Sequence, residues 1–298
     1  MKKFVITLIF AAASYQLWSQ QISPYSAYVN YPEIVNPAFV GLDSATSALF
    51  LYRNQWTGIE GAPQSVFFML QGKLENQPVG IAVQASHEST NIRSSTAGYV
   101  TSSYAVSLAA QHKLSFGLSA GIIQNVLQYG KVRALRLDDP ALLQSDQNQT
   151  VFDMSAGMTY RWRDLLTVAF SSQQLLGQRF IYEDQGDQRR GSYGLFRHYQ
   201  LMSFFRLPMK GSVDVKVIGV LKSVQSLKAQ FDYGVQVGYK DIINMSALYR
   251  HANAVSFIMG INISSKISTV YSYEIPANGI GIGNTQGSHE FGISYRIR

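Results

Sequence analysis

The sequence predicts an all-β protein, a transmembrane antiparallel β-barrel of about 14 strands. First, apolar and polar residues alternate with the period of a two-faced strand over most of residues 44–298. Second, the polar positions are rich in Gly, Ser, Gln and Asn, and charged residues make up only 14% of the chain. Third, short and long connections alternate between the predicted strands, which is typical of outer-membrane barrels.

The chain begins with the features of a secretory signal peptide, which we assign to residues 1–19. Lys2 and Lys3 form a basic start, residues 4–13 form an apolar run, and small or polar residues lead to Ser19. The apolar run is too short for a membrane-spanning helix. An ordinary buried helix is the alternative, but the basic start favours an exported protein. The chain has no cysteine, so its stability has to come from size, packing or a membrane.

Residues 20–43 precede the first predicted strand and show no sustained period. They contain three prolines and several aromatic residues, which makes them too apolar for a free tail. We expect this segment to fold against the periplasmic end of the barrel or to plug its lumen. A poorly ordered terminus is the alternative.

The alternation is clearest in residues 152–162, 231–239, 267–275 and 289–297. In residues 231–239 every second residue is aromatic or Val, and the residues between them are Asp, Gly or Gln. The apolar faces often end in Tyr or Trp. A β-sandwich would place Lys, Glu and Thr on its solvent face, whereas an apolar face with aromatic ends suits lipid and a Gly/Ser/Gln face suits a polar lumen.

The connections give the predicted barrel its orientation. We expect strands near residues 45–55, 64–72, 78–87, 95–107, 113–126, 152–162, 165–172, 197–207, 212–222, 226–239, 242–249, 254–263, 266–275 and 288–298. Alternate connections are short, and the others include long stretches at 127–151 and 173–196. This pattern predicts short periplasmic turns, long extracellular loops and two periplasmic termini in the outer membrane of a Gram-negative bacterium.

The sequence shows no catalytic or metal-binding motif. Its five histidines are far apart and have no cysteine beside them, which excludes the usual zinc spacings. The glycine-rich stretch 279–284 lacks the Lys-Ser/Thr that follows a phosphate-binding loop. The acidic pairs Asp138-Asp139 and Glu183-Asp184 are typical of solvated loops. We therefore predict no enzyme activity, no cofactor and no metal.

The positive charge is modest and dispersed. The formal net charge of +7 falls to +5 when Lys2 and Lys3 are removed (7 − 2 = 5). Without a Lys/Arg block, nucleic acid is excluded as the expected partner. The basic residues of two predicted loops could meet an acidic partner, meet lipopolysaccharide phosphates, or stay solvated; they are Lys131, Arg133, Arg136, Arg189 and Arg190.

The stretch YRNQWTGIEGAPQS, residues 52–65, supplies the candidate contact residues. We expect Trp56 near the outer aromatic girdle. Arg53 and Gln55 alternate with Tyr52 and Asn54, so only one pair faces the lumen. A buried Arg53 needs a partner, for which the N-terminal segment is the candidate. The candidate cargo or plug contacts are Arg53, Asn54, Gln55, Trp56, Asn36 and Pro37.

Three motifs in order resemble the PorP/SprF family of type IX secretion outer-membrane proteins. They are NPAFVG at residues 36–41, YRNQW with the following Gly-Ala-Pro turn, and the last strand SHEFGISYRIR. The likeness covers the whole mature chain. One departure is the terminus Arg296-Ile297-Arg298, because outer-membrane barrels commonly end in an aromatic residue.

The resemblance implies a non-enzymatic role in exporting, capturing or anchoring specific cell-surface proteins. It implies two kinds of partner: a secreted protein with a C-terminal sorting domain, such as a gliding-type adhesin, and other type IX secretion components. Outer-membrane lipid and lipopolysaccharide are the expected surroundings. The alternative function is an outer-membrane channel or transporter for small solutes, which rests on the barrel and its predicted Gly/Ser/Gln lumen alone.

Overall fold

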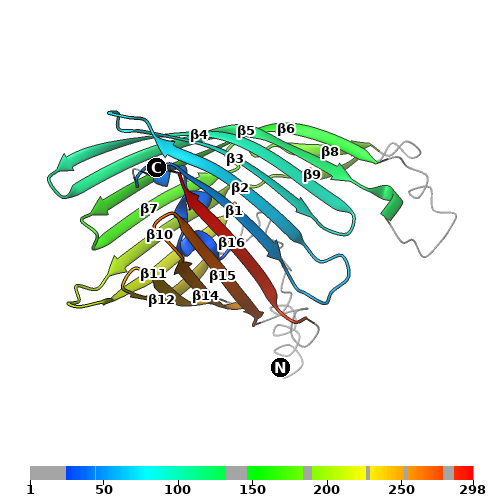
Figure 1. The fold of residues 1–298 in the computed structure, drawn as a ribbon. Coiled ribbons are helices and arrows are strands. Elements are labelled where there is room, and N and C mark those ends of the chain that lie inside the picture. Colours follow the sequence, from blue (N-terminus) through cyan, green and yellow to red (C-terminus); the bar gives the residue numbers. More distant parts are fainter. Residues whose placement is uncertain are drawn as a thin grey trace, which may run out of the picture.

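The protein is a closed antiparallel β-barrel of 14 strands (Figure 1). The computed structural model describes residues 25–43, 45–131, 146–183, 190–225, 229–251, 254–277 and 285–297. The barrel strands are β1 (Ser47–Asn54), β2 (Gln64–Lys73), β3 (Val79–Ser89), β4 (Arg93–Ala109), β5 (His112–Leu127), β6 (Gln147–Trp162), β7 (Leu166–Gln173), β10 (His198–Arg206), β11 (Val213–Val224), β12 (Gln230–Tyr239), β13 (Ile243–Arg250), β14 (Ala254–Asn262), β15 (Ile267–Pro276) and β16 (Ser288–Arg296). The predicted fold class and the predicted number of barrel strands are confirmed.

The connections differ in length at the two ends of the barrel. At one end, called here the turn end, β6 and β7 are separated by only residues 163–165 and β12 and β13 by 240–242. At the other end, the loop end, residues 55–63 and 174–197 connect barrel strands. None of the described helices is long and apolar enough to cross a membrane.

Two details of the predicted long loops are wrong. The stretch 173–196 contains a separate hairpin of β8 (Arg179–Glu183) and β9 (Arg190–Gly194). Each of these strands is only five residues long, too short to establish a period. The loop predicted up to residue 151 ends earlier, because β6 begins at Gln147. Residues 147–150 are all polar, so they lack the apolar alternation that marks a strand.

The outward side chains form an apolar surface. Along β1 and β2 buried and exposed residues alternate, and the exposed ones include Phe50, Tyr52, Phe68 and Leu70. The same alternation exposes large apolar side chains around the rest of the wall, such as Phe257 on β14. In a bilayer these side chains face lipid, and closure of the sheet pairs the backbone groups of every strand.

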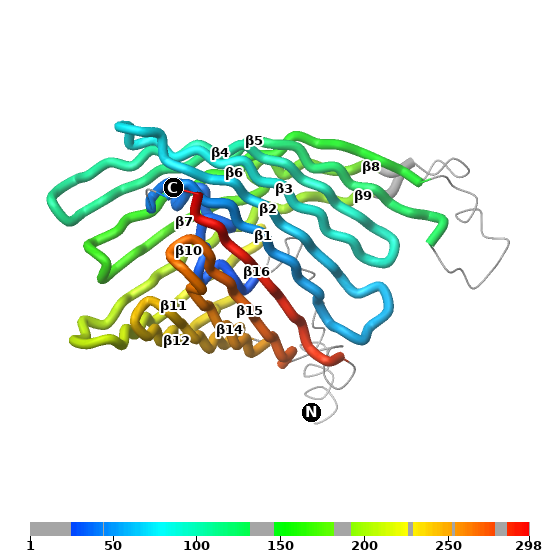
Figure 2. The backbone as a smooth tube through the Cα atoms, in the orientation of Figure 1, coloured from blue at the N-terminus to red at the C-terminus, as the bar shows by residue number. Residues whose placement is uncertain are grey.

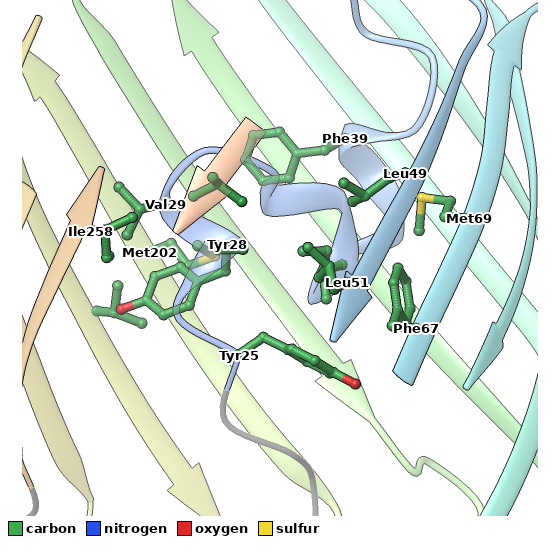
Figure 3. Packing of buried hydrophobic residues seen from close by; sticks show 14 of the residues in the cluster. Tyr25, Tyr28, Val29, Phe39, Leu49, Leu51, Phe67, Met69, Met202 and Ile258 are labelled. Atoms are coloured by element: carbon green, nitrogen blue, oxygen red, sulfur yellow. The ribbon is translucent and has the colours of Figure 1, made fainter. Parts of the chain in front are cut away.

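Residues 25–43, called here the luminal segment, lie inside the barrel (Figure 2). They form three short 3₁₀ helices, η1 (Ala27–Val29), η2 (Pro32–Ile34) and η3 (Pro37–Phe39). The tightly buried Tyr28 and Val29 belong to one apolar core with inward-facing Leu51, Met202 and Ile258 (Figure 3). The expectation of a uniformly polar lumen is therefore wrong on these strands, because their inward positions pack against an apolar segment.

The luminal segment runs from the loop side of the interior to the turn end. At its start the Tyr25 ring lies 5.9 Å from that of Phe67. At its end Val40 accepts a hydrogen bond from the Ser103 hydroxyl at 2.6 Å, and Gly41 lies against Gly80 near the start of β3. Within the described residues, the segment thus occupies the middle of the barrel along much of its length.

Glycines let the segment approach the wall closely. A Cβ added at Gly117 of β5 would lie 2.3 Å from the carbonyl carbon of Pro37, and one added at Gly157 of β6 would lie 2.0 Å from Asn36 Oδ1. Both distances are far below van der Waals contact. The wall strands under η3 therefore require residues without a side chain at these two positions.

Candidate functional site

Six charged side chains form a connected group on the inner wall, called here the ion cluster. Its members are Arg53 (β1), Lys222 (β11), Asp232 (β12), Arg250 (β13), Glu274 (β15) and Glu290 (β16). Five of the six are almost fully buried, and the side chain of Lys222 is 24% exposed. Three cations and three anions give a formal sum of zero (3 − 3 = 0), which is what the burial of so many charges requires.

The pairs form a continuous chain along the wall. Arg53 reaches Glu290 Oε2 at 3.3 Å with Nη1 and Glu274 Oε1 at 3.0 Å with Nη2. Arg250 Nη1 lies 2.7 Å from the second oxygen of Glu274. Asp232 closes the other end, because its Oδ2 lies 3.9 Å from Arg250 Nε and 2.5 Å from Lys222 Nζ.

Strand register places opposite charges side by side. Arg53 pairs with Glu290 across β1 and β16, and Asp232 pairs with Arg250 across β12 and β13. Opposite charges at such directly paired positions stabilise a sheet. Glu274 faces Ser256 across β14 and β15 and accepts a hydrogen bond from its hydroxyl at 3.0 Å. The ion cluster is therefore a product of the β-ladder itself.

The ion cluster also holds the start of the luminal segment. The backbone N–H groups of Ser26 and Ala27 donate to the two carboxylate oxygens of Glu290 at 2.9 and 2.8 Å. Arg250 donates to the hydroxyl of Ser26 at 3.0 Å. Because η1 has no side-chain cap, Glu290 satisfies amide groups that would otherwise be buried without a partner.

Tyr28 adds a second attachment. Its hydroxyl donates to Asp232 at 3.4 Å, and Lys222 Nζ lies 4.9 Å from the centre of its ring. Burial raises the pKa of Tyr28, so the hydroxyl stays protonated and remains a donor. The segment is thus fixed by charge-assisted hydrogen bonds as well as by apolar packing.

The predicted candidate residues fall into separate places. Arg53 faces the lumen as part of the ion cluster, and its direct partners are carboxylates of the wall rather than groups of the N-terminal segment. The link from Arg53 to the luminal segment passes through Glu290. The expected partner in the N-terminal segment is thus replaced by one on β15 and one on β16.

Asn36 and Pro37 lie further along the luminal segment. Asn36 is 1% exposed; its Oδ1 accepts from Ala38 N at 2.9 Å and its Nδ2 donates to the carbonyl oxygen of Phe170 at 3.1 Å. Pro37 is the first residue of η3, where its missing N–H costs nothing. Asn36 therefore caps η3 and ties it to β7.

Asn54, Gln55 and Trp56 lie at the loop end, outside the ion cluster. Asn54 ends β1, and Gln55 N donates to the carbonyl oxygen of Pro63 at 2.9 Å, which closes the first loop. Trp56 is 40% exposed and has a φ of 50°. The structure thus separates these three residues from the interior group of Arg53, Asn36 and Pro37.

Sequence reasoning missed five of the six members of the ion cluster. Asp232, Glu274 and Glu290 stand on the polar face of the predicted strands, where Gly, Ser and Gln are the usual residues. One signal could have found these residues: several charged residues stand at such positions, although the chain has few charges. Which charges meet depended on the register of strands far apart in sequence.

Several other predicted features lie in the loops. Lys131 ends the short η4 (Tyr129–Lys131) and is exposed, and Arg190 begins β9. The remaining candidates lie outside the described residues; they are Arg133, Arg136, Asp138, Asp139, Asp184, Arg189 and the glycine-rich stretch 279–284. In the described part of the chain no group of three His, Asp or Glu side chains is arranged to hold a metal ion.

Two cavities lie on opposite sides of the luminal segment. One, of about 150 Å³, is lined by Tyr25 and Val35 together with residues of β3–β6 and of the β8–β9 hairpin. The other, of about 570 Å³, is polar and lies toward the turn end, beside Tyr31 and Glu33. Burial raises the pKa of Glu33 to about 7, and its Oε1 accepts from Gln71 Nε2 at 2.7 Å. The segment therefore separates the two cavities.

Comparison with known proteins gives one family and several barrels. Residues 18–295 match the family described as type IX secretion system membrane protein PorP/SprF. A Pseudomonas aeruginosa FadL homologue is 10% identical with a TM-score of 0.53, covering 88% of this chain and 93% of its own. The KdgM porin is 9% identical with a TM-score of 0.43, covering 85% and 99%. At 10% identity, the likeness to the FadL homologue shows a shared barrel fold alone. No curated protein matches the sequence.

Proposed function

The chain belongs to the PorP/SprF family of type IX secretion system membrane proteins, and from this premise we propose that it captures or holds specific secreted proteins at the cell surface. The cargo class is a large, adhesin-like protein with a C-terminal sorting domain. Other components of the secretion system are its further partners. In this proposal the barrel is a rigid, non-enzymatic holder rather than a conduit.

The observation that carries this proposal is the anchored luminal segment. Residues 25–43 occupy the interior, and the ion cluster and the apolar core fix them there. A barrel filled in this way suits a rigid platform better than a solute path. Its long connections at the loop end then supply the binding surface.

The proposed orientation places the loop end outside the cell. β16 ends at Arg296 at the turn end, so the C-terminus faces the periplasm, and residues 1–19 are removed as a signal peptide. The docking surface consists of the first hairpin loop, from Asn54, Gln55 and Trp56 through residue 63, with the connections 128–146 and 174–197. Outer-membrane lipid covers the apolar wall, and lipopolysaccharide phosphates meet the basic loop residues.

Affinity purification tests the cargo role. The full chain, tagged after residue 298, is cross-linked in cells and purified from membranes. We expect a large secreted protein or a secretion component to be recovered. Replacing residues 57–62 of the first loop with Gly and Ser should reduce this recovery, whereas the same replacement of the turn 75–77 should not. Recovery of neither class of protein would contradict the proposal.

Planar-bilayer recordings separate this role from the alternative, a channel or transporter for small solutes. We expect low conductance from the full protein, because the luminal segment lies across its interior. A variant that lacks residues 25–43 should conduct if its barrel still forms. High conductance of the unmodified protein would favour the channel.

A further inference from the structure

The cavity of about 150 Å³ on the loop side of the luminal segment has the features of a binding site. Its walls come from three parts of the chain: Tyr25 and Val35 of the segment, the inner face of β3–β6, and Tyr193 and Leu195 at the β8–β9 hairpin. None of the six residues of the ion cluster lines it, and the inference drawn from it goes beyond the secretion role proposed above.

The β8–β9 hairpin covers the cavity. Phe180 and Leu195 are buried in a small apolar core with Ile123 of β5, against which Tyr99 and Tyr193 pack. Arg93 lies over the Tyr193 ring at 4.7 Å and pairs with Glu88 at 3.2 Å. The side chains of Arg93 and Glu88 are 22% and 21% exposed, which places them at the mouth of the cavity.

Three buried acceptor atoms lining this cavity have no hydrogen-bond partner among the described residues. They are Asn125 Oδ1, Asp153 Oδ1 and Gln174 Oε1. Asn125 and Asp153 are 1% and 0% exposed, and Gln174 is 7% exposed. A buried acceptor without a donor is costly. Gln174 lies near Asp153, because Leu175 N donates to the carbonyl oxygen of Met154 at 2.9 Å, so these two acceptors indicate a ligand that supplies more than one donor.

The charge of the cavity points to a cation. Asp153 accepts one hydrogen bond from the Tyr99 hydroxyl at 2.9 Å, and no Lys or Arg in the described part of the chain pairs with it. The Glu88 carboxylate and the Arg93 guanidinium balance each other. The charge left over is therefore that of Asp153, and a buried carboxylate is stabilised by a positive partner.

We propose that this cavity binds an aliphatic ammonium group. An ammonium carries three donors, enough for both Asp153 and Gln174. Asn125 lies opposite Gln149, four residues along β6 from Asp153 (153 − 149 = 4), which is too far to share the same nitrogen. The rings of Tyr25, Phe67, Tyr99 and Tyr193 also line the cavity, and aromatic faces attract cations. The ammonium belongs either to a free amine or to a lysine side chain of a bound peptide.

Calorimetric titration of the purified full chain in detergent tests this site. The probes are n-butylammonium chloride, the neutral n-butanol, and the peptide Gly-Lys-Gly blocked at both ends. We expect saturable binding of butylammonium and much weaker binding of butanol. Tighter binding of the peptide would identify a lysine side chain as the ligand, and tighter binding of butylammonium a free amine.

Asp153→Asn keeps the size of the side chain and removes its charge. It should weaken butylammonium binding at least about tenfold, because hydrogen bonds to a charged group are the strong ones. Asp241→Asn is the matched control: Asp241 lies in a turn at the turn end with a φ of 54°, which Asn also tolerates. Equal binding of butanol and butylammonium to the unmodified protein would overturn the proposal, as would undiminished binding to folded Asp153→Asn or no binding of either ammonium probe.

Discussion

Replacing Arg53 with Ala should release the luminal segment while the barrel remains assembled. Arg53 is 1% exposed and lies between two carboxylates, Glu274 and Glu290. Its removal changes the formal charge of the ion cluster from 0 to −1. Glu274 keeps Arg250 at 2.7 Å, but Glu290 loses the guanidinium that lies 3.3 Å from its Oε2.

The magnitude follows from the burial of the pair. Removal of one partner of a buried ion pair costs roughly 3–5 kcal/mol, because the other charge is left uncompensated. Glu290 holds Ser26 N and Ala27 N, so most of this cost falls on the docking of η1. At about 1.4 kcal/mol per factor of ten, docking should weaken by roughly a hundredfold or more.

Hydrogen–deuterium exchange of residues 25–43 measures this effect, and heat-modifiable migration in SDS gels reports whether the barrel is folded. Arg93→Ala is the matched control, because the Arg93–Glu88 pair is partly exposed and such pairs contribute only about 0–1 kcal/mol. A second variant, Arg53→Met with Glu290→Gln, restores a neutral cluster and should exchange more slowly than Arg53→Ala. Unchanged exchange of residues 25–43 in folded Arg53→Ala would refute the role assigned to the ion cluster.

Three further changes test other contacts of the luminal segment. Gly117→Ala should displace η3, because the new Cβ would lie 2.3 Å from the carbonyl carbon of Pro37; Gly98→Ala, whose nearest atom is at 4.0 Å, is the control, and equal exchange in both variants would contradict the close approach. Glu33 binds its proton more tightly in the folded state, with a pKa of about 7 against an ordinary 4.5, so docking should weaken as pH rises from about 4.5 to 7. Exchange corrected for its intrinsic rate should therefore be faster at pH 8 than at pH 5, and Glu33→Gln should remove this difference. Asn36→Ala removes the cap of η3 and its bond to Phe170 and should cost about 1 kcal/mol of docking; slower exchange around η3 would exclude that role.

The period of two was enough to predict the barrel and most of its strands. This period predicts the strands because each strand has one face toward lipid, and that face is mostly apolar, as in Phe231, Tyr233 and Val235. The inner face followed no comparable rule. Leu51 and Met202 face the interior because the luminal segment covers them, and this depends on contacts between distant parts of the chain.

The candidate residues, like the strands, could be predicted only in part, because their contacts join distant parts of the chain. Arg53 was singled out because a charged residue on an inward position needs a partner. Its partners lie more than 200 residues away, at Glu274 and Glu290, and only the pairing of β1 with β16 brings them together. Asn36 and Pro37 carried no charge signal, and the glycines that admit η3 are indistinguishable in sequence from other strand glycines.

The position of the Arg53–Glu290 pair has a consequence for assembly. The two residues lie across from each other on the first and last strands of the barrel, so they meet only when the cylinder closes. A slip of one residue in this register would turn Arg53 outward into lipid and leave both acids without it. Glu290 also accepts hydrogen bonds from Ser26 N and Ala27 N, so the pair that marks correct closure of the barrel also binds the luminal segment. A barrel that closes without this segment leaves the Glu290 carboxylate without those two donors at the contact between β1 and β16.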